Sequence, residues 1–323
     1  MAVYTKLNKE NIEEILSNYS IGNLKEFRGI EEGIENTNYF LLVDNKKYIL
    51  TIYEKRVKEK DLPFFSQLMS NLNKSGFKCP VPIESKNKKT IVSYKNKNLM
   101  IVSFIEGRAK NILSPGNCKS VGQEVAKMHE MTKNFNIQRK NNLSVNSWRN
   151  IFNQVKDKCV HIHKDLPLLI ESNLKDVEKN WPKNLPAGII HADLFSDNIF
   201  FNNDNFSGII DFYFSCNDFY ALEIAICFNA LCFDGPKNNL SFNVTKAINF
   251  MNGYNQFRKI NDNEKKHIKV LSQGSALRFL LTRVFDALNT VEGAVVKVKD
   301  PMEYLVRLEF HKNSKNFEDY FFR

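Results

Sequence analysis

The stretch Gly188-Ile-Ile-His191-Ala-Asp193-Leu-Phe-Ser-Asp-Asn198-Ile-Phe-Phe201 decides how this chain folds. A polar tetrapeptide, residues 202–205, separates it from Phe206-Ser-Gly-Ile-Ile-Asp211-Phe212. Two apolar runs around a polar turn predict a β-hairpin. Because a hairpin brings its two ends together, we expect Asn198 and Asp211 to converge. An amide oxygen and a carboxylate suit Mg²⁺, which takes few protein oxygens together with substrate phosphates.

Asp193 precedes that site on a loop, where it is placed to accept a proton from an attacking hydroxyl. The spacing from His191 through Asp193 to Asn198, followed by a strand that ends at Asp211, is that of a kinase catalytic loop. Alanine after His191 and the lack of glycine after Asp211-Phe212 do not suit a protein kinase. They resemble the aminoglycoside-phosphotransferase family of small-molecule kinases, which has a His-Gly-Asp-like loop and an Ile-Asp-aromatic strand end. The alternative is a polar turn in a buried sheet, and His191 itself is better interpreted as a packed loop anchor than as a proton carrier.

The order of patterns along the chain predicts an α+β, two-lobed protein-kinase-like fold. An N-terminal lobe with a mixed or antiparallel sheet, residues 1–106, is expected to end in a hinge. A larger, mainly helical C-terminal lobe would follow in residues 107–323. The resemblance implies ATP and Mg²⁺ as cofactors, with Asp193 as the catalytic base and with Asn198 and Asp211 as metal ligands.

Composition and charge narrow the class of protein. The chain has 323 residues, of which 43% are hydrophobic and 25% charged, as in an ordinary globular protein with room for two lobes. Its formal charge of +10 comes from Lys residues that are scattered, often beside Asn, as in Lys95-Asn-Lys-Asn98. A nucleic-acid site would gather them on one face. We therefore interpret the charge as a solvated surface that also attracts an anionic nucleotide, and expect a small-molecule substrate with no nucleic-acid partner.

Cysteine usage and hydropathy indicate a cytoplasmic protein. None of the six cysteines forms a C-x-x-C pair, and most lie in apolar surroundings, so we expect small buried residues. The N-terminus shows no apolar signal segment. The most apolar run, residues 219–233, is too short for a membrane span and carries Glu223 and Asn229. No membrane partner is expected, and the pattern leaves the oligomeric state open.

The N-terminal part carries candidate nucleotide-binding residues. A strand-loop-strand pattern places Gly29 and Gly33 where a kinase's loop covers the nucleotide phosphates. Glycine permits close backbone approach, and free N–H groups can face phosphate. Asn36, Thr37 and Asn38 follow as polar donors. A plain hairpin turn would give the same two glycines.

Two residues expected of a kinase are missing here. The strand at residues 48–53 holds Thr51 where a kinase carries its phosphate-binding Lys. The helix at residues 61–75 has phenylalanines where the acidic partner of that Lys is usual. We hypothesise that Lys55 or Arg56 supplies the positive charge, and exposed surface cations are an equal alternative.

The hinge and the helices follow. The segment Val102-Ser-Phe-Ile-Glu-Gly107 resembles a hinge that binds adenine by backbone groups, which makes Ser103, Phe104 and Ile105 candidates. Apolar spacing predicts a first helix at 8–18 capped by Asn8. Further helices are expected to open at Ser114-Pro115 and at Pro301, and to cover residues 147–158, 166–180, 218–233, 242–257 and 262–290.

A more specific resemblance, to one group within this family, extends over nearly the whole chain. The motifs Tyr48-Ile-Leu-Thr-Ile-Tyr-Glu-Lys-Arg56, Asp61-Leu-Pro-Phe-Phe65, His191-Ala-Asp-Leu-Phe195 and Arg278-Phe-Leu-Leu-Thr-Arg283 look like those of bacterial homoserine kinases within this family. This implies ATP-dependent phosphorylation of the L-homoserine hydroxyl, a step of threonine biosynthesis. One departure is Glu223, which stands where an Asp is usual beneath the catalytic loop, and we expect it still to anchor that loop.

The sequence holds no motif for the acceptor site that is as specific as the catalytic loop. An α-carboxylate calls for the fork-shaped donor that Arg supplies, and Arg278 is the first choice because it has no acidic neighbour on its own helix. Tyr213 and Phe214 are candidates for the pocket wall. The alternatives are a kinase of choline, ethanolamine or an aminoglycoside, or a non-catalytic kinase-like binding module.

Overall fold

A computed structural model describes residues 4–30, 36–54, 57–236, 239–289 and 299–321. Its contacts divide the chain into two compact units, each described by itself below. Among the described residues, the first unit holds those up to Gly107 together with Ser207–Tyr213, and the second holds the rest. The sequence division at 106/107 did not include Ser207–Tyr213 in the first part. These residues belong there because the Ile209 N–H donates to the Lys78 carbonyl at 3.0 Å and Gly208 lies against Ile105.

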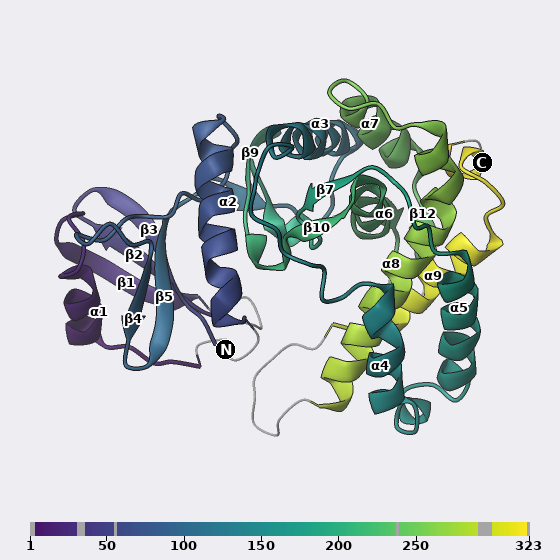
Figure 1. Cartoon of the computed structure of the whole chain (residues 1–323), viewed down its shortest axis with the longest axis horizontal. Helices are drawn as coiled ribbons and strands as arrows, with labels where there is room; N and C mark the ends of the chain where they lie inside the picture. Colours follow the sequence, from purple (N-terminus) through teal and green to yellow (C-terminus); the bar gives the residue numbers. More distant parts are fainter. Residues whose placement is uncertain (1–3, 31–35, 55–56, 237–238, 290–298, 322–323) are drawn as a thin grey trace. The chain divides into compact units, whose positions relative to one another are not determined.

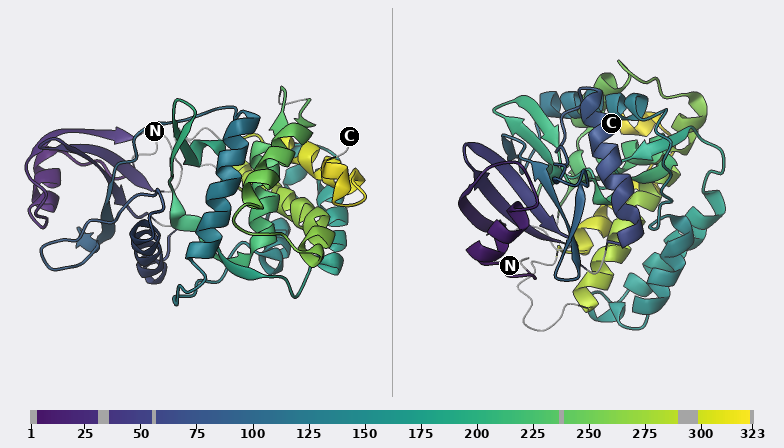
Figure 2. Two further views of the ribbon diagram at one scale, coloured as in Figure 1. Left: turned by 90° about the horizontal axis from the view of Figure 1, so that it is seen from above. Right: turned by 60° about the vertical axis from the view of Figure 1, so that its left-hand side comes forward.

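The first unit is built on a five-stranded antiparallel sheet in the order β1-β2-β3-β5-β4 (Figure 1). Its strands are β1 (Leu24–Ile30), β2 (Thr37–Val43), β3 (Lys46–Ile52), β4 (Ile91–Tyr94) and β5 (Lys97–Ser103). Side chains alternate across the sheet, so one face carries the buried core under helix α1 (Lys9–Leu16). Figure 2 shows this sheet and α1 from two further sides. The predicted antiparallel sheet is confirmed.

Both predicted helices of this unit are present among the described residues, and α1 ends at Leu16, two residues before its predicted end. Asn8 caps α1 by accepting from the Asn11 backbone N–H at 2.9 Å, which satisfies a donor that the helix itself leaves open. Helix α2 (Leu62–Lys74) follows a 3₁₀ turn, Glu59–Asp61, and has proline in its first turn. It stops before Gly76, whose φ of 84° lies in the left-handed region that glycine adopts without strain.

Helix α8 is the centre of the second unit, and it packs against α4, α5, α6 and α9 (Figure 1). The helices of this unit are α3 (Pro115–Met131), α4 (Val145–Val155), α5 (Leu166–Asn180), α6 (Tyr220–Leu231), α7 (Val244–Tyr254), α8 (Asp262–Leu288) and α9 (Met302–Asn313), with 3₁₀ turns at Cys159–His161, Ser196–Asn198 and Glu318–Tyr320. Helices α3 and α7 pack closely because both present glycine. A Cβ on Gly122 would lie 2.1 Å from the Phe250 carbonyl oxygen, and one on Gly253 would lie 2.0 Å from that of Lys119.

Short strands interrupt the helices and place the loops. The predicted hairpin is confirmed as β8 (Ile199–Asn202) and β9 (Asn205–Ile209), in a small sheet of order β6-β8-β9. A second pair joins β7 (Ala187–Ile190) to β10 (Cys216–Phe219). The remaining short strands are β6 (Arg108–Ala109), β11 (Phe233–Asp234) and β12 (Ser241–Phe242). The predicted helix at 218–233 was therefore too long at its start, since residues 218 and 219 pair with β7.

Two expectations about apolar residues can be compared with the structure. All six cysteines are free and buried, as expected. Burial raises the pKa of the Cys79 thiol to about 12, so the thiol stays protonated and packs like a small apolar side chain. Within the described residues no helix is both long enough and apolar enough to cross a bilayer.

Candidate active site

The catalytic loop leaves β7 and turns sharply at Ala192, whose φ is 65°. A residue with a Cβ pays about 1–2 kcal/mol for this left-handed conformation, so neighbouring groups must hold it. Glu223, on α6 and fully buried, does so from below. Its carboxylate accepts the backbone N–H of His191 and, at 3.1 and 3.2 Å, that of Ala192. The expectation that Glu223 anchors the loop is confirmed.

Burial shifts the pKa of the Glu223 carboxyl upward. Loss of solvent raises the pKa of Glu223 to about 7, against the lowering effect of the two backbone N–H groups and of Arg278. The loop anchor therefore changes protonation near neutral pH. Only the ionised form accepts hydrogen bonds with both oxygens.

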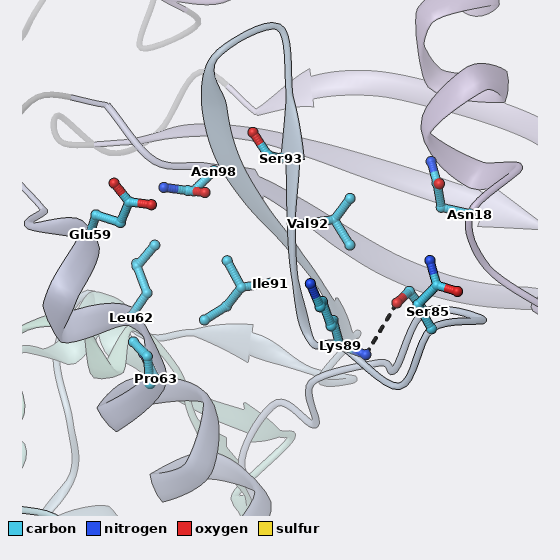
Figure 3. A pocket seen from close by; sticks show the side chains of 11 residues that line it. Asn18, Glu59, Leu62, Pro63, Ser85, Lys89, Ile91, Val92, Ser93 and Asn98 are labelled. Atoms are coloured by element: carbon cyan, nitrogen blue, oxygen red, sulfur yellow. Dashed lines mark hydrogen bonds between the residues drawn. The ribbon is translucent and has the colours of Figure 1, made fainter.

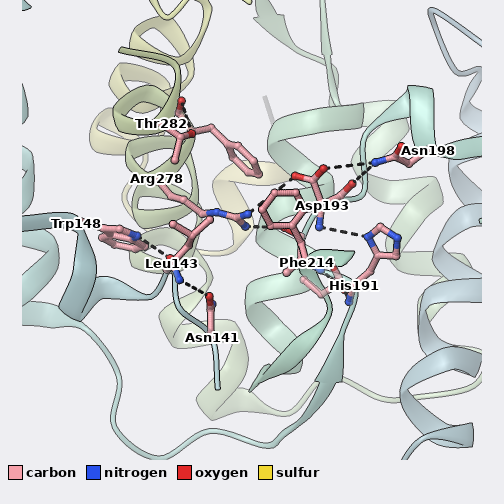
Figure 4. A network of polar contacts seen from close by, with 12 residues as sticks. Asn141, Leu143, Trp148, His191, Asp193, Asn198, Phe214, Arg278 and Thr282 are labelled. Carbon is pink, nitrogen blue, oxygen red and sulfur yellow. Dashed lines mark hydrogen bonds and ion pairs between the residues drawn. The ribbon is translucent and has the colours of Figure 1, made fainter. Parts of the chain in front are cut away.

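Asp193 and Asn198 lie on the same loop and contact one another (Figure 4). The Asn198 side-chain N–H donates to the Asp193 backbone carbonyl at 2.8 Å and approaches the Asp193 carboxylate at 3.5 Å. His191 is fully buried and its Nδ1 accepts the Asp193 backbone N–H at 3.3 Å, as suits a loop anchor. Since the amide nitrogen of Asn198 points inward, its oxygen is left for another partner. No hydrogen bond reaches that oxygen among the described residues.

Arg278 of α8 reaches the same loop from the other side. Its Nη1 donates to the Ala192 carbonyl at 2.5 Å, and its Nη2 lies 4.0 Å from Asp193 Oδ1. The guanidinium lies between the rings of Phe214 and Phe279, at 5.7 and 4.5 Å from their centroids. Figure 4 shows Arg278, Phe214 and Asp193 pointing toward one another. Arg278 therefore does have an acidic partner, Asp193, which lies on the catalytic loop and not on α8.

Asp211 and Tyr213 belong to the first unit. Asp211 is exposed and has a φ of 63°, a left-handed conformation that Asp tolerates better than most residues. The Tyr213 ring packs edge-on against Tyr53 at 5.2 Å and Phe65 at 5.7 Å. Burial raises the pKa of Tyr213, against the lowering effect of the neighbouring Tyr53 and Thr51 side chains. The role of Tyr213 in an acceptor pocket stays a prediction.

Strand alternation separates the candidate phosphate-binding residues. Asn38 shares a face with Thr51, whose hydroxyl donates to its side-chain oxygen at 2.8 Å. Thr37 is buried on the opposite face, where its hydroxyl bonds Glu54 at 2.8 Å. The Asn36 side chain accepts the Glu54 backbone N–H at 3.3 Å. Gly29 lies within β1, paired with β2.

Gly33, Lys55 and Arg56 fall outside the described residues, so the hypothesis on the replacement cation stays untested.

The hinge candidates follow β5. Ser103 is fixed by two hydrogen bonds to Val81, one to its carbonyl and one from its N–H, each 2.9 Å. The Phe104 ring packs edge-on against Phe40. In the part of the chain that the structure describes, the backbone N–H and carbonyl of Ile105 have no hydrogen-bond partner. Backbone groups in that state are what adenine recognition requires.

An open cavity of about 460 Å³ in the first unit lies elsewhere (Figure 3). It is lined by residues of β4 and of the start of α2, with Asn18, Ser85 and Lys89 at one end. None of the candidate nucleotide-binding residues lines it. We therefore do not assign the nucleotide to this cavity.

Comparison with known proteins identifies the family. A family model described as the phosphotransferase enzyme family matches residues 26–242. The chain belongs to this family. It is 44% identical over 318 residues to the homoserine kinase of Paramagnetospirillum magneticum and covers 97% of that protein, with 97% of its own length aligned. It is 40% identical over 320 residues to the homoserine kinase of Mesorhizobium japonicum, with 99% of both chains covered.

Solved structures of a kinase and a phosphotransferase share the fold. An amicoumacin kinase in complex with AMP-PNP, Ca²⁺ and Ami matches with a TM-score of 0.70 at 12% identity, over 96% of this chain and 95% of that one. A spectinomycin phosphotransferase in complex with ADP and spectinomycin also gives 0.70, at 14% identity and 98% of each chain. The predicted protein-kinase-like fold is confirmed. As a member of the family, the chain is an ATP-dependent kinase.

Sequence reasoning missed two polar groups of this kinase. In the first unit, Glu54 accepts from Lys97 at 2.6 Å and from the hydroxyls of Thr5 and Thr37. Burial raises the pKa of Glu54, but these donors together lower it overall. In the second unit, the Asp218 carboxylate accepts from Asn141 at 2.7 Å. No local pattern indicates either group, because Lys97 lies 43 residues from Glu54 and Asn141 lies 77 residues from Asp218.

Proposed function

We propose that this kinase transfers the γ-phosphoryl group of ATP to the side-chain hydroxyl of L-homoserine and releases O-phospho-L-homoserine. The observation that carries the proposal is the catalytic loop, in which Asp193 is held by an anchored backbone. Full-length similarity to the two homoserine kinases supports the choice of acceptor.

Asp193 accepts the proton of the acceptor hydroxyl in this proposal. Its carboxylate is half-buried, with Asn198 at 3.5 Å and Arg278 at 4.0 Å from its oxygens. An ionised carboxylate offers about four lone-pair sites, so it can accept from a hydroxyl beside these contacts. Phosphoryl transfer needs positioning and charge neutralisation more than covalent catalysis, so one well-placed base is enough.

The Asn198 oxygen and the Asp211 carboxylate fit Mg²⁺, which prefers hard oxygen ligands and retains phosphate oxygens as further ligands. When bound, the ion neutralises charge on the ATP phosphates. No cluster of three or more acidic, His or Cys side chains suited to a metal occurs among the described residues.

For the nucleotide, we propose that the segment Ser103–Ile105 binds adenine through the open backbone groups of Ile105. The loop from Gly29 to Asn38, which includes Gly33, would cover the phosphates. Asn36 and Asn38 remain candidate donors through their side-chain N–H groups, whereas the Thr37 hydroxyl donates to Glu54. Lys55 or Arg56 would supply the missing cation.

The acceptor is a zwitterion and needs two charged partners. The sequence predicted Arg278 for the α-carboxylate, but its contacts with the Ala192 carbonyl and with Asp193 leave that role to another donor. For the α-ammonium we propose Asp218, which forms no ion pair within 4.0 Å among the described residues. Burial raises the pKa of Asp218 despite hydrogen bonds from Asn141 and the Phe219 backbone. A bound ammonium would offset that loss of solvent.

A coupled assay of ADP release tests the acceptor. We expect kcat/KM for L-homoserine to exceed that for homoserinol and choline by about 10³-fold or more, since a site built for a carboxylate leaves its cation unpaired with acceptors that lack one. Spectinomycin and an aminopropanol serve as further acceptors. If homoserinol works as well as homoserine, the acceptor assignment fails while the kinase assignment stands. If no acceptor of this panel stimulates ADP release, the acceptor belongs to another chemical class and the homoserine assignment fails.

A further inference from the structure

The backbone of Ala192 is held on both sides by buried charges of opposite sign. Its N–H donates to the Glu223 carboxylate, and its carbonyl accepts from Arg278 Nη1 at 2.5 Å. Both charged side chains are almost fully buried, Glu223 at 0% and Arg278 at 4% exposure. This residue also has the left-handed φ of 65° that an alanine disfavours. The two charges thus fix the peptides that precede and follow the strained residue.

The surroundings of Arg278 leave it little room to bind a ligand. Phe214 and Phe279 cover its guanidinium, and its Nε is buried without a hydrogen-bond partner among the described residues. The segment behind Phe214 is fixed in turn, because Arg139 donates to the carbonyls of Phe214 and Ser215 at 3.3 and 2.9 Å. An acceptor carboxylate would have to displace these contacts to reach the fork of Arg278.

We propose that Arg278 is a positioning residue, which holds the Ala192 carbonyl and aims the Asp193 carboxylate, rather than the group that binds the acceptor carboxylate. The inference rests on the proposed function only in its kinetic readout. Arg278 lies in the middle of α8, the helix against which most of the second unit packs, so the loop takes its position from the most rigidly supported helix of that unit. Glu223 sets the turn from α6, and Arg278 sets it from α8.

Two roles for Arg278 give different kinetics. If Arg278 positions Asp193, Arg278→Met lowers kcat by about 10²-fold, as small displacements of a reacting group do, and leaves KM for homoserine within about twofold. If Arg278 binds the carboxylate, the same variant raises KM for homoserine and stops discriminating against homoserinol. Arg283→Met is the matched control, because Arg283 is on the same helix and pairs with Glu303 at 3.0 Å instead of the loop.

Replacing the strained residue separates the roles further. Glycine adopts the left-handed conformation without penalty, so Ala192→Gly lowers the backbone strain against which Arg278 must hold the loop. We expect Ala192→Gly to restore about tenfold of the kcat lost in Arg278→Met, the gain that the removed penalty allows. If Ala192→Gly does not restore kcat and Arg278→Met has a raised KM for homoserine, the proposal is overturned. If Arg278→Met does not fold, Arg278→Lys, which keeps the charge but loses the fork, takes its place in the same series.

A readout without substrate keeps the inference separate from the choice of acceptor. Thermal unfolding of the wild type, both single variants and the double variant forms a double-mutant cycle. We expect Ala192→Gly to raise the melting temperature less in the Arg278→Met background than in the wild type, because a residue that is no longer held can leave the left-handed conformation and has less strain to lose. Equal shifts in both backgrounds would show that Arg278 does not hold Ala192. This result stands even if homoserine proves not to be the acceptor.

Discussion

Replacing Asp193 by Asn removes the proposed base, together with the charge that faces Arg278 at 4.0 Å, and leaves the backbone contacts of the loop in place. The two side chains have the same shape, and the backbone contacts that place this residue, from Asn198 at 2.8 Å and to His191 at 3.3 Å, do not involve the carboxylate. An amide cannot accept the hydroxyl proton, so we expect kcat to fall by 10²- to 10⁴-fold, the range for loss of a general base. At 1.36 kcal/mol for each factor of ten, that is about 2.7–5.4 kcal/mol of transition-state stabilisation.

The assay is homoserine-dependent ADP release, with nucleotide affinity measured separately by equilibrium binding. Asp197→Asn is the matched control, since Asp197 lies on the same loop but is exposed and paired only at the surface with Lys299 at 3.0 Å. Loss of that pair changes stability by no more than about 1 kcal/mol and should leave kcat unchanged. If Asp193→Asn turns over within a few-fold of the wild type, Asp193 is not the base. If both variants lose activity equally, the loop has been perturbed and the charge of Asp193 is not the cause.

Three further predictions concern other parts of the molecule. Because burial raises the pKa of Glu223 to about 7 from 4.5, the folded protein keeps a proton there that the unfolded chain releases, so the wild type should lose stability relative to Glu223→Gln as the pH rises from about 4.5 to 7. Chemical denaturation should show a relative loss on the order of 3 kcal/mol across that window, and a difference independent of pH would count against it. Changing Lys55 and Arg56 together to Met should raise KM for ATP about tenfold or more with KM for homoserine unaffected, and an unchanged KM for ATP would assign the phosphate cation to another residue. Asp218→Asn should raise KM for homoserine about tenfold with little change for ATP, which initial-rate kinetics will check; an equal effect on both substrates would indicate a structural role.

Local sequence signals predicted the long elements well, because their causes are local. Asn8 caps α1 through its own side chain, and Pro63 and Gly76 define the ends of α2 by their backbone preferences alone. The hairpin of β8 and β9 followed from two apolar runs around a polar turn. The two-residue strands β6, β11 and β12 could not be predicted, since they form only where a distant segment offers a pairing edge.

In the candidate site, too, the contacts within one short segment were predictable and the contacts between distant elements were not. Asp193 and Asn198 follow from one short motif, and their mutual contact is local to it. The approach of Arg278 to Asp193 joins residues 85 positions apart and depends on how α8 packs. The burial of Thr37 was within reach of sequence reasoning, because strand alternation already separates it from Asn38. What remained out of reach were contacts set by packing between elements.

The hydrogen bonds around Glu54 have a practical consequence for how the protein is handled. The backbone N–H groups of Tyr4 and Thr5 donate to Thr37 at 3.0 and 3.1 Å, and the Thr5 hydroxyl donates to Glu54 at 2.7 Å. Tyr4 and Thr5 therefore fix the first residue of β2 and the residue that follows β3 by two. Trimming these residues, or fusing a purification tag close before them, removes or strains the donors to Thr37 and Glu54. A tag placed after a spacer of several residues avoids an apparent change in ATP affinity that would otherwise be mistaken for a property of the enzyme.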